Sequence, residues 1–401
     1  MKITKRISAA LLAVILLASF SSCSGGSSSE NSGSSLGASR ASTVSTPGTS
    51  SAASSRSETP QESKGVQTDA VDKLLSEMTL EEKVGQMFYS SVPVGAGEDW
   101  ITKYHMGGYV LSGNDFDDKS ADDVRAMIQG YQRKSKVPLL IGVDEEGGTV
   151  LRVSYHEKLR ESGFDSPKNV YQSGGWNAVD ATETEKAELL TSLGINVNNA
   201  PVCDITSNPE SFIYDRSFSG DPEEASTFVK KVVAVCKQKK LGTVLKHFPG
   251  YGDNTDTHED MSYDSKSLDE FRSSDFIPFK AGIAAGADSI MVAHNIMADV
   301  DPDYPASLST AVHNIIRNEL GFDGVIMTDD LVMQAITKYT GTEAAAVIAA
   351  KCGNDILCCT DVETQYPAVL SAVKNGEIPQ EQIDASVKRI LKWKQNLGLI
   401  Q

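Results

Sequence analysis

The chain has 401 residues, of which 40% are hydrophobic, and its formal net charge is −17. These apolar side chains are enough for one large globular domain or two small ones, which excludes disorder over the whole chain. The acidic excess argues against a nucleic-acid binder and against attachment to anionic lipid through protein charge, because both need a basic face.

The first 22 residues have the composition of an export signal. Three basic residues within the first six precede an apolar run over residues 7–20, which ends in Ser21-Ser22-Cys23. This pattern predicts a secretory signal peptide over residues 1–22, because the apolar run is too short to span a bilayer as a helix. Cysteine directly after small residues resembles a bacterial lipobox, so Cys23 is expected to be the lipidated first residue of the mature protein. Ordinary signal cleavage and secretion is the alternative.

The next segment, residues 23–65, is expected to be a lipid-anchored, disordered linker. Residues 24–65 contain 16 serines and almost no large apolar side chain. Such a stretch cannot bury a core, and random-coil scaling gives it a reach of about 35 Å. We therefore expect an exported domain, residues 66–401, held at the extracytoplasmic face of the cell membrane. Five further cysteines without a CxxC pair are read as buried thiols.

From residue 66 onward, short apolar runs alternate with amphipathic stretches. The runs lie at residues 87–89, 108–111, 139–143, 195–202, 244–245, 289–292, 325–327 and 356–359. The intervening stretches include residues 122–132, 181–193, 223–239, 276–284, 309–320 and 343–351, and a last one, residues 380–395, reads as a closing helix. Continuous apolar strands that alternate with helices are typical of a parallel sheet covered on both faces. Eight such repeats predict a single (β/α)8 TIM barrel, with a doubly wound open sheet as the alternative.

Polar and charged residues follow most of these runs. They are Asp144-Glu145-Glu146, Asp204, Lys246-His247, His294-Asn295, Asp329-Asp330 and Thr360-Asp361. One such residue is usually only a solvated strand end. In a parallel barrel, however, all these ends meet at one mouth, where active sites lie. The sequence therefore predicts a site built from several strand ends.

The segment from Lys246 to His258 is the densest in chemically useful residues. Its glycines and proline let the backbone leave the strand and fold over the mouth. Asp256 and His258 are two residues apart, close enough in a turn for carboxylate and imidazole to pair. Such a pair orients the ring and gives a proton carrier near neutral pH. The alternative is a polar loop with a surface histidine.

Asp329 comes directly after the seventh run. An ionised carboxylate at that position can attack a carbon that carries positive charge, or it can ligate a metal. Asp330 is expected to point the other way if the strand continues past Asp329. One of the two would then serve structure rather than chemistry.

Several segments together carry a resemblance to a known family. Residues 315–319 with 324–329, residues 78–87, residues 143–148 and residues 215–218 are similar to segments of glycoside hydrolase family 3. The stretch KHFPGYG followed by Asp256-Thr257-His258 resembles the β-N-acetylhexosaminidase branch of that family, which acts on peptidoglycan fragments. The similarity covers residues 69–399.

The resemblance implies a role for each matching residue. Asp329 would be the nucleophile that forms a covalent glycosyl-enzyme, and His258 the general acid/base, with Asp256 as its orienting partner. The residues at sugar-binding positions would be Asp144, Arg152, Arg216, Lys246 and His247. The implied reaction is retaining, exo-acting hydrolysis that releases terminal N-acetylglucosamine, by a single-domain monomer without metal or cofactor.

Three alternatives stay open at this point. A metal-dependent barrel hydrolase would use His247, His258, His294 and Asp329 as ligands. A tethered sugar-binding lipoprotein would use the same pocket without turnover, although binding alone needs neither a nucleophile nor a proton carrier. A phosphorolytic variant would pass the sugar to phosphate, because a neutral histidine repels an anion less than a carboxylate does.

Overall fold

The computed structural model describes residues 69–254, 262–340, 342–358 and 361–401. The predicted signal peptide, Cys23 and the predicted linker lie outside these residues, and so do Asp256 and His258. None of the described helices combines the length and the apolar character that crossing a bilayer requires.

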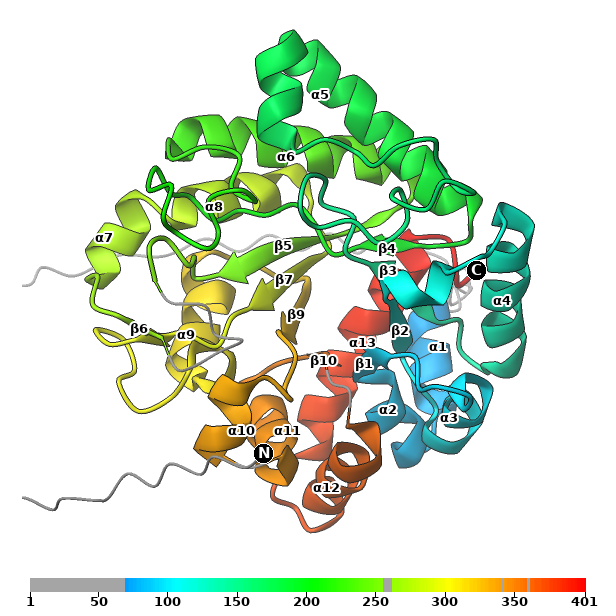
Figure 1. Cartoon of the computed structure of the whole chain (residues 1–401). Coiled ribbons are helices and arrows are strands. Elements are labelled where there is room, and N and C mark those ends of the chain that lie inside the picture. The colour runs from blue at the N-terminus through cyan, green and yellow to red at the C-terminus, as the bar shows by residue number, and fades with distance from the viewer. Residues whose placement is uncertain (1–68, 255–261, 341, 359–360) are drawn as a thin grey trace, which may run out of the picture. The chain divides into compact units, whose positions relative to one another are not determined.

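Eight parallel strands form the centre of the described chain (Figure 1). They are β1 (Phe88–Ser91), β2 (Gly108–Leu111), β3 (Leu140–Val143), β4 (Val197–Asn198), β5 (Gly242–Phe248), β7 (Ser289–Val292), β9 (Val325–Thr328) and β10 (Leu357–Cys358). Their order in the sheet is β10-β1-β2-β3-β4-β5-β7-β9. A parallel bridge between Met327 and Ile356 joins β9 to β10, so the sheet closes on itself. The predicted barrel is confirmed, and each of the eight apolar runs contributes one of its strands.

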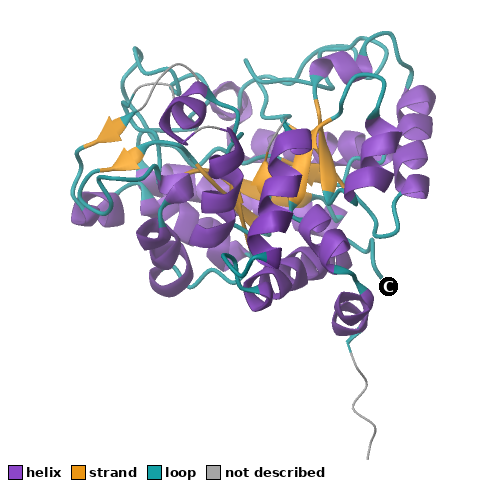
Figure 2. Cartoon of the chain, turned by 90° about the horizontal axis from the view of Figure 1, so that it is seen from below, coloured by secondary structure: helices purple, strands orange, loops and turns teal. Residues whose placement is uncertain are grey.

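Helices surround the strands (Figures 1 and 2). The longer ones are α4 (Ala121–Lys134), α5 (Pro167–Ser192), α6 (Pro222–Lys239), α8 (Phe276–Ala285), α11 (Thr342–Cys352), α12 (Val362–Lys374) and α13 (Gln380–Asn396). The shorter ones are α1 (Ala70–Glu77), α2 (Leu80–Gln86), α3 (Gly97–Tyr104), α7 (Leu268–Ser273), α9 (Thr310–Asn314) and α10 (Gln334–Thr340), with single turns at Gly113–Phe116, Ala306–Leu308 and Ile315–Glu319. The apolar side chains of the strands and of the inner helix faces form one contiguous core.

The two ends of the barrel differ. At the amino ends of the strands, α13 lies across the opening: Lys394 Nζ donates to Gln86 Oε1 and to the Gly107 carbonyl, and the Trp393 ring packs against Gly242. The carboxyl ends carry the long connections and a small two-stranded ribbon of β6 (Tyr263–Asp264) and β8 (Ile296–Met297), seen apart from the main sheet in Figure 2. This second end is therefore the one available for a site.

Candidate active site

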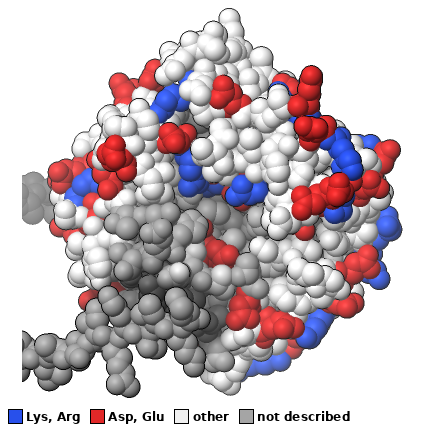
Figure 3. Space-filling view, viewed as in Figure 1, with Lys and Arg blue, Asp and Glu red and all other residues white. Residues whose placement is uncertain are grey.

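A cavity of about 290 Å³ opens at the carboxyl ends of the strands. Each of the eight strands supplies at least one lining residue, at or near its carboxyl end: Ser91, Leu111, Asp144, Asn199, Lys246, Met291, Asp329 and Cys358. The remaining lining residues are Val110, Ser112, Glu146, Val150, Arg152, Arg216, His247 and Asp330. Figure 3 shows this face, with acidic and basic side chains both present at its central hollow. The volume is at the low end of the range of ligand pockets, about 300–1,000 Å³.

Strand β5 contributes two neighbouring side chains to the cavity. In a regular strand Lys246 and His247 would point to opposite faces. The pairing of β5 with β7 changes register between Leu245 and Phe248. Such an irregularity re-aims side chains at the rim of a barrel. Both Lys246 and His247 consequently line the cavity.

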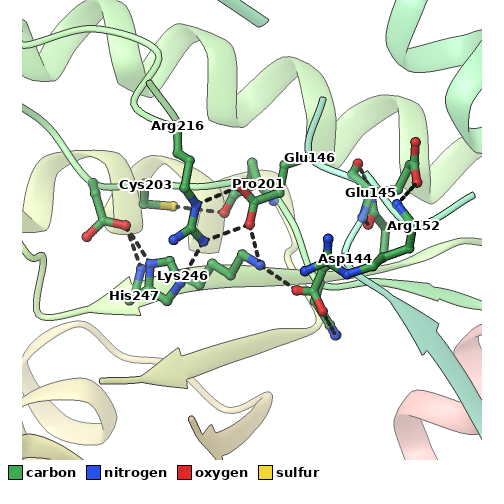
Figure 4. Close-up of polar contacts among 12 residues, drawn as sticks. Asp144, Glu145, Glu146, Arg152, Pro201, Cys203, Arg216, Lys246 and His247 are labelled. Atoms are coloured by element: carbon green, nitrogen blue, oxygen red, sulfur yellow. Dashed lines mark hydrogen bonds and ion pairs between the residues drawn. The ribbon is translucent and has the colours of Figure 1, made fainter. Parts of the chain in front are cut away.

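Beneath the cavity, two cations share one buried carboxylate, as Figure 4 shows. Arg216 donates from Nε and Nη2 to the two oxygens of Glu146, at 2.9 and 2.8 Å. Lys246 Nζ lies 2.6 Å from Glu146 Oε1 and 2.7 Å from Asp144 Oδ1. A two-point guanidinium–carboxylate pair fixes the angle of both groups as well as their distance. The network therefore holds Lys246, Arg216 and Asp144 in place before any ligand enters.

The charges of this network stabilise one another. Burial by itself raises the pKa of the Glu146 carboxyl, but the nearby Lys246 ammonium and Arg216 guanidinium outweigh burial and hold that pKa well below its usual range. Burial by itself lowers the pKa of the Lys246 ammonium, and the Asp144 and Glu146 carboxylates more than reverse this effect. Both groups therefore stay ionised across the physiological pH range.

Arg152 reaches the cavity because Glu145 shapes its loop. The buried Glu145 carboxylate accepts hydrogen bonds from the backbone N–H groups of Arg152 and Val153, at 2.8 and 2.7 Å, and from the Ser154 hydroxyl. Glu145 is itself tied to β4, because its own N–H donates to Asn198 Oδ1. The loop after β3 is thus folded back on its own strand end, with Arg152 at the cavity wall.

Asp329 and Asp330 both line the cavity, and the condition under which Asp330 is expected to point away, a strand that continues past Asp329, is not met. The reason is that β9 ends at Thr328, and the alternation of a strand does not continue into the turn. The Asp329 N–H donates to the Val292 carbonyl at 2.9 Å, and the Asp330 N–H donates to Asp329 Oδ1 at the same distance. The turn thereby fixes the Asp329 carboxylate over the end of β9.

His294 is not a lining residue of the cavity. Its Nδ1 lies 2.7 Å from the Ser307 hydroxyl, and its Nε2 lies 3.0 Å from the Asp330 carbonyl oxygen. The side chain is fully buried. His294 therefore supports the turn that carries Asp329 and Asp330 from behind.

The structure brings six of the predicted site residues to one cavity: Asp144, Arg152, Arg216, Lys246, His247 and Asp329. Sequence reasoning gives no role to Glu146 or to Asp204, although both follow strand ends. Glu146 carries Arg216 and Lys246, and the Asp204 carboxylate contacts His247. The sequence feature that could have indicated a role for Glu146 is its position two residues after Asp144. Its burial beneath two cations depends on tertiary contacts and leaves no local pattern.

In the described part of the chain, no group of three or more His, Cys, Asp and Glu side chains is placed to hold a metal ion. The cations and carboxylates around the cavity instead provide many hydrogen-bond donors and acceptors at fixed positions. Such a lining suits a small ligand that is covered with hydroxyl groups. A carboxylate at the rim could in addition act on a carbon of that ligand.

Comparisons with known proteins agree with this geometry. Residues 79–393 match the family described as "Glycosyl hydrolase family 3 N terminal domain". The chain is 34% identical over 313 residues to a protein named "Beta-hexosaminidase" from Stenotrophomonas maltophilia strain K279a, an alignment that covers 75% of this chain and 86% of that protein.

Two solved structures have a similar fold. One is a glycoside hydrolase family 3 β-N-acetylglucosaminidase from Paenibacillus sp. FPU-7, with a TM-score of 0.74 and 31% identity over 80% of this chain and 63% of that one. The other is a β-glucoside phosphorylase, BglX, with a TM-score of 0.73 and 26% identity over 82% of this chain and 60% of that one. The present chain thus spans less than two thirds of either protein.

Proposed function

Since this chain belongs to glycoside hydrolase family 3, we propose that it is a retaining, exo-acting β-N-acetylhexosaminidase that releases terminal N-acetylglucosamine from peptidoglycan-derived or related glycans. The observation that carries the proposal is the shared cavity: Asp329 lies in the same small pocket as the anchored groups Asp144, Arg216 and Lys246. A pocket of about 290 Å³ suits one sugar ring rather than a chain of them, which favours action at a chain end.

The proposed chemistry has two steps. In the first, Asp329 attacks the anomeric carbon of the bound sugar, while protonated His258 donates its proton to the leaving oxygen. The glycosyl ester forms as the glycosidic bond breaks. In the second step neutral His258 takes a proton from water, the water oxygen attacks the anomeric carbon, and the Asp329 carboxylate leaves. Asp256 keeps the His258 ring oriented throughout.

Substitution of the nucleophile tests this proposal. We expect Asp329→Asn to lower kcat on an aryl N-acetyl-β-glucosaminide by about 10³-fold or more, with folding unchanged. Asp330→Asn, one residue away in the same cavity, should still form the glycosyl-enzyme. Wild-type turnover in the Asp329→Asn variant would show that the nucleophile is another residue.

The acid/base assignment predicts a dependence on the leaving group. His258→Ala should slow hydrolysis of an N-acetylglucosaminyl disaccharide by about 10²- to 10⁴-fold, because a sugar alkoxide leaves poorly without a proton. An aryl glycoside with an acidic phenol should suffer much less in its first step. Equal losses on both substrates would contradict a role for His258 as the acid.

Transfer to phosphate is the second candidate reaction, because one of the similar structures is that of a β-glucoside phosphorylase. We propose water as the acceptor, because the similar protein from Stenotrophomonas maltophilia is named a β-hexosaminidase. Once Asp329 is esterified, three carboxylates of the lining face three cations, so the lining has no net positive charge that would draw in phosphate. In phosphate buffer we therefore expect N-acetylglucosamine and no sugar 1-phosphate.

The location of the enzyme is a proposal that rests on the amino-terminal sequence. We propose that Cys23 is lipidated and that residues 24–65 tether the catalytic domain to the outer face of the cell membrane. Palmitate labelling of the expressed full chain should follow the protein and disappear in Cys23→Ala. An unlabelled wild-type chain in the medium would instead support ordinary secretion.

A further inference from the structure

Asp204 follows β4 and is almost fully buried, with 1% of its surface exposed. Both of its carboxylate oxygens are engaged by the chain around β5. Oδ2 accepts the His247 backbone N–H at 3.1 Å and lies 2.7 Å from His247 Nδ1. Oδ1 accepts the Tyr251 N–H at 2.7 Å. The steps proposed above do not use this carboxylate.

These contacts fix the hydrogen on the His247 ring. A carboxylate only accepts hydrogen bonds, so Nδ1 of His247 must be the nitrogen that carries hydrogen. The other ring nitrogen, Nε2, lies 3.2 Å from Arg216 Nη2. Because a guanidinium only donates, Nε2 must accept. His247 is therefore a neutral imidazole with its single N–H at Nδ1.

The orientation of His247 in turn decides which atoms of Arg216 face the cavity. Arg216 uses Nε and one hydrogen of Nη2 on Glu146, and its second Nη2 hydrogen points to His247 Nε2. Within the described residues, Nη1 makes no hydrogen bond to the protein. The Glu146 carboxylate and the His247 imidazole thus occupy two sides of the Arg216 guanidinium, and the edge that carries Nη1 is left for a ligand.

We propose that Asp204 is a positioning residue, which holds His247 as the Nδ1–H tautomer so that His247 and Glu146 together aim Arg216 at the bound sugar. The proposal rests on the proposed function, because it assigns Arg216 to sugar binding. Asp204 acts through His247 and does not touch the sugar itself. A merely structural Asp204 would hold the backbone at His247 and Tyr251 and would have no effect on the ring.

Asp204→Asn cannot satisfy all these contacts. If the amide oxygen faces His247, the amide NH₂ meets the Tyr251 N–H, donor against donor. If the amide is turned over, the NH₂ faces Nδ1 and forces the hydrogen to Nε2, where it meets the Arg216 guanidinium. In either case one charge-assisted hydrogen bond is lost, and the second arrangement also releases Arg216.

The first test is kinetic and uses the full chain with an aryl N-acetyl-β-glucosaminide. Asp204→Asn should raise KM by about 10- to 100-fold and change kcat by less than about threefold, because the affected contact binds ground state and transition state alike. Asp288→Asn is the matched control. It removes a partly buried carboxylate that accepts hydrogen bonds from Thr243, at the opposite end of β5, and should leave both constants unchanged.

A double-mutant cycle separates action through the ring from a general loss of structure. In a His247→Ala background, the further substitution Asp204→Asn should cost less than about threefold in kcat/KM, because the ring it orients is absent. Equal losses in both backgrounds would overturn the proposal. This outcome would leave the proposed function intact, whereas absence of turnover by the wild-type chain would contradict the proposed function alone.

The second test does not depend on activity. The chain has six histidines, and ¹⁵N-labelled histidine spectra, with His247→Ala used to identify the signal, report which ring nitrogen carries hydrogen. We expect His247 to be neutral and protonated at Nδ1 in the wild type. In Asp204→Asn an Nε2–H form marks molecules whose amide is turned over, whereas the other amide orientation keeps the hydrogen at Nδ1. An Nε2–H ring or a doubly protonated ring at His247 in the wild type would overturn the assignment.

Discussion

Glu146 is the residue on which two cations of the cavity, Arg216 and Lys246, depend. Its carboxylate accepts from Arg216 and Lys246 and is almost fully buried, so neither cation is left with an uncompensated charge. A buried ion pair contributes little net stability, but removal of one partner leaves the other charge exposed to a low dielectric. The network therefore serves geometry: it fixes the donors that meet the ligand.

We expect Glu146→Gln to raise KM for the aryl glycoside by about 10- to 100-fold and to destabilise the domain by about 3–5 kcal/mol, since Arg216 and Lys246 lose their shared counter-charge. Kinetics and chemical denaturation measure the two effects. Asp180→Asn is the control, because it breaks an ion pair with Lys231 between α5 and α6, outside the cavity lining. Similar KM values for the two variants would contradict the role of Glu146.

At the residue scale, the sequence predicts side chains that directly follow strands. Asp144, Lys246 and Asp329 are recognisable because each is a charged residue directly after an apolar run, where a buried strand reaches the mouth of the barrel. Glu146 and Asp204 receive no role from the sequence, since their effect lies in contacts across 70 and 43 residues. No local spacing records such contacts.

At the scale of elements, β1 and β3 approach each other without direct pairing. Tyr89 of β1 places its hydroxyl against Gly142 of β3, and a Cβ at residue 142 would overlap that hydroxyl. Tyr89 is fully buried, and its hydroxyl lies 3.4 Å from Asn199 Oδ1 at the cavity. Glycine at position 142 is thus required by packing between layers of the barrel interior.

Gly142→Ala should destabilise the domain by about 1–3 kcal/mol, because the Tyr89 ring has no space into which it can move. Gly130→Ala is the matched control, since Gly130 lies inside α4 and a Cβ there meets only the ends of two long side chains, Glu98 Oε1 at 3.4 Å and Arg133 Nη2 at 3.9 Å. That change should be neutral or stabilise by up to about 1 kcal/mol, because alanine favours helix. Thermal unfolding compares the two, and equal effects would refute the packing argument.

Periodicity identifies the eight strands and the helices between them, because a buried parallel strand is a short apolar run. The exact ends of the helices and strands are harder to predict from the sequence. Helix α5 begins at Pro167, fourteen residues before the predicted stretch at 181–193, and its backbone leaves helical geometry at Gly175, where φ is +63°. Because of this kink, the residues before Gly175 do not share one helical periodicity with the stretch at 181–193. The β6–β8 ribbon escapes prediction because each of its strands has two residues.

At the scale of the molecule, α13 completes the domain by covering the amino ends of the strands. Its Lys394 is fully buried, with Gln86 Oε1 and the Gly107 carbonyl as acceptors. Burial lowers the pKa of the Lys394 ammonium to about 7. A neutral amine still has two N–H groups, so both hydrogen bonds survive deprotonation.

This buried lysine predicts a pH dependence of stability. In the unfolded chain the lysine keeps its proton up to pH about 10.4, whereas in the folded chain it loses the proton near pH 7. The unfolded state thus binds more protons between these values, and stability rises with pH across that window. The free energy of unfolding of the wild type should therefore rise relative to that of Lys394→Met between pH 7 and pH 10. Lys388→Met, at a more exposed position of the same helix, is the control for removing a lysine charge from α13.

The covalent bond between Asp329 and the sugar is the central feature of the proposed reaction. Incubation of the full chain with a fluorinated N-acetylglucosaminyl fluoride, which forms the intermediate faster than water removes it, followed by mass spectrometry of the digested protein, tests this bond directly. We predict that one glycosyl unit is attached to the peptide containing Asp329 and that fragmentation places it on Asp329 itself. A label on Asp330 or Asp144, or inverted configuration of the released sugar, would contradict the account.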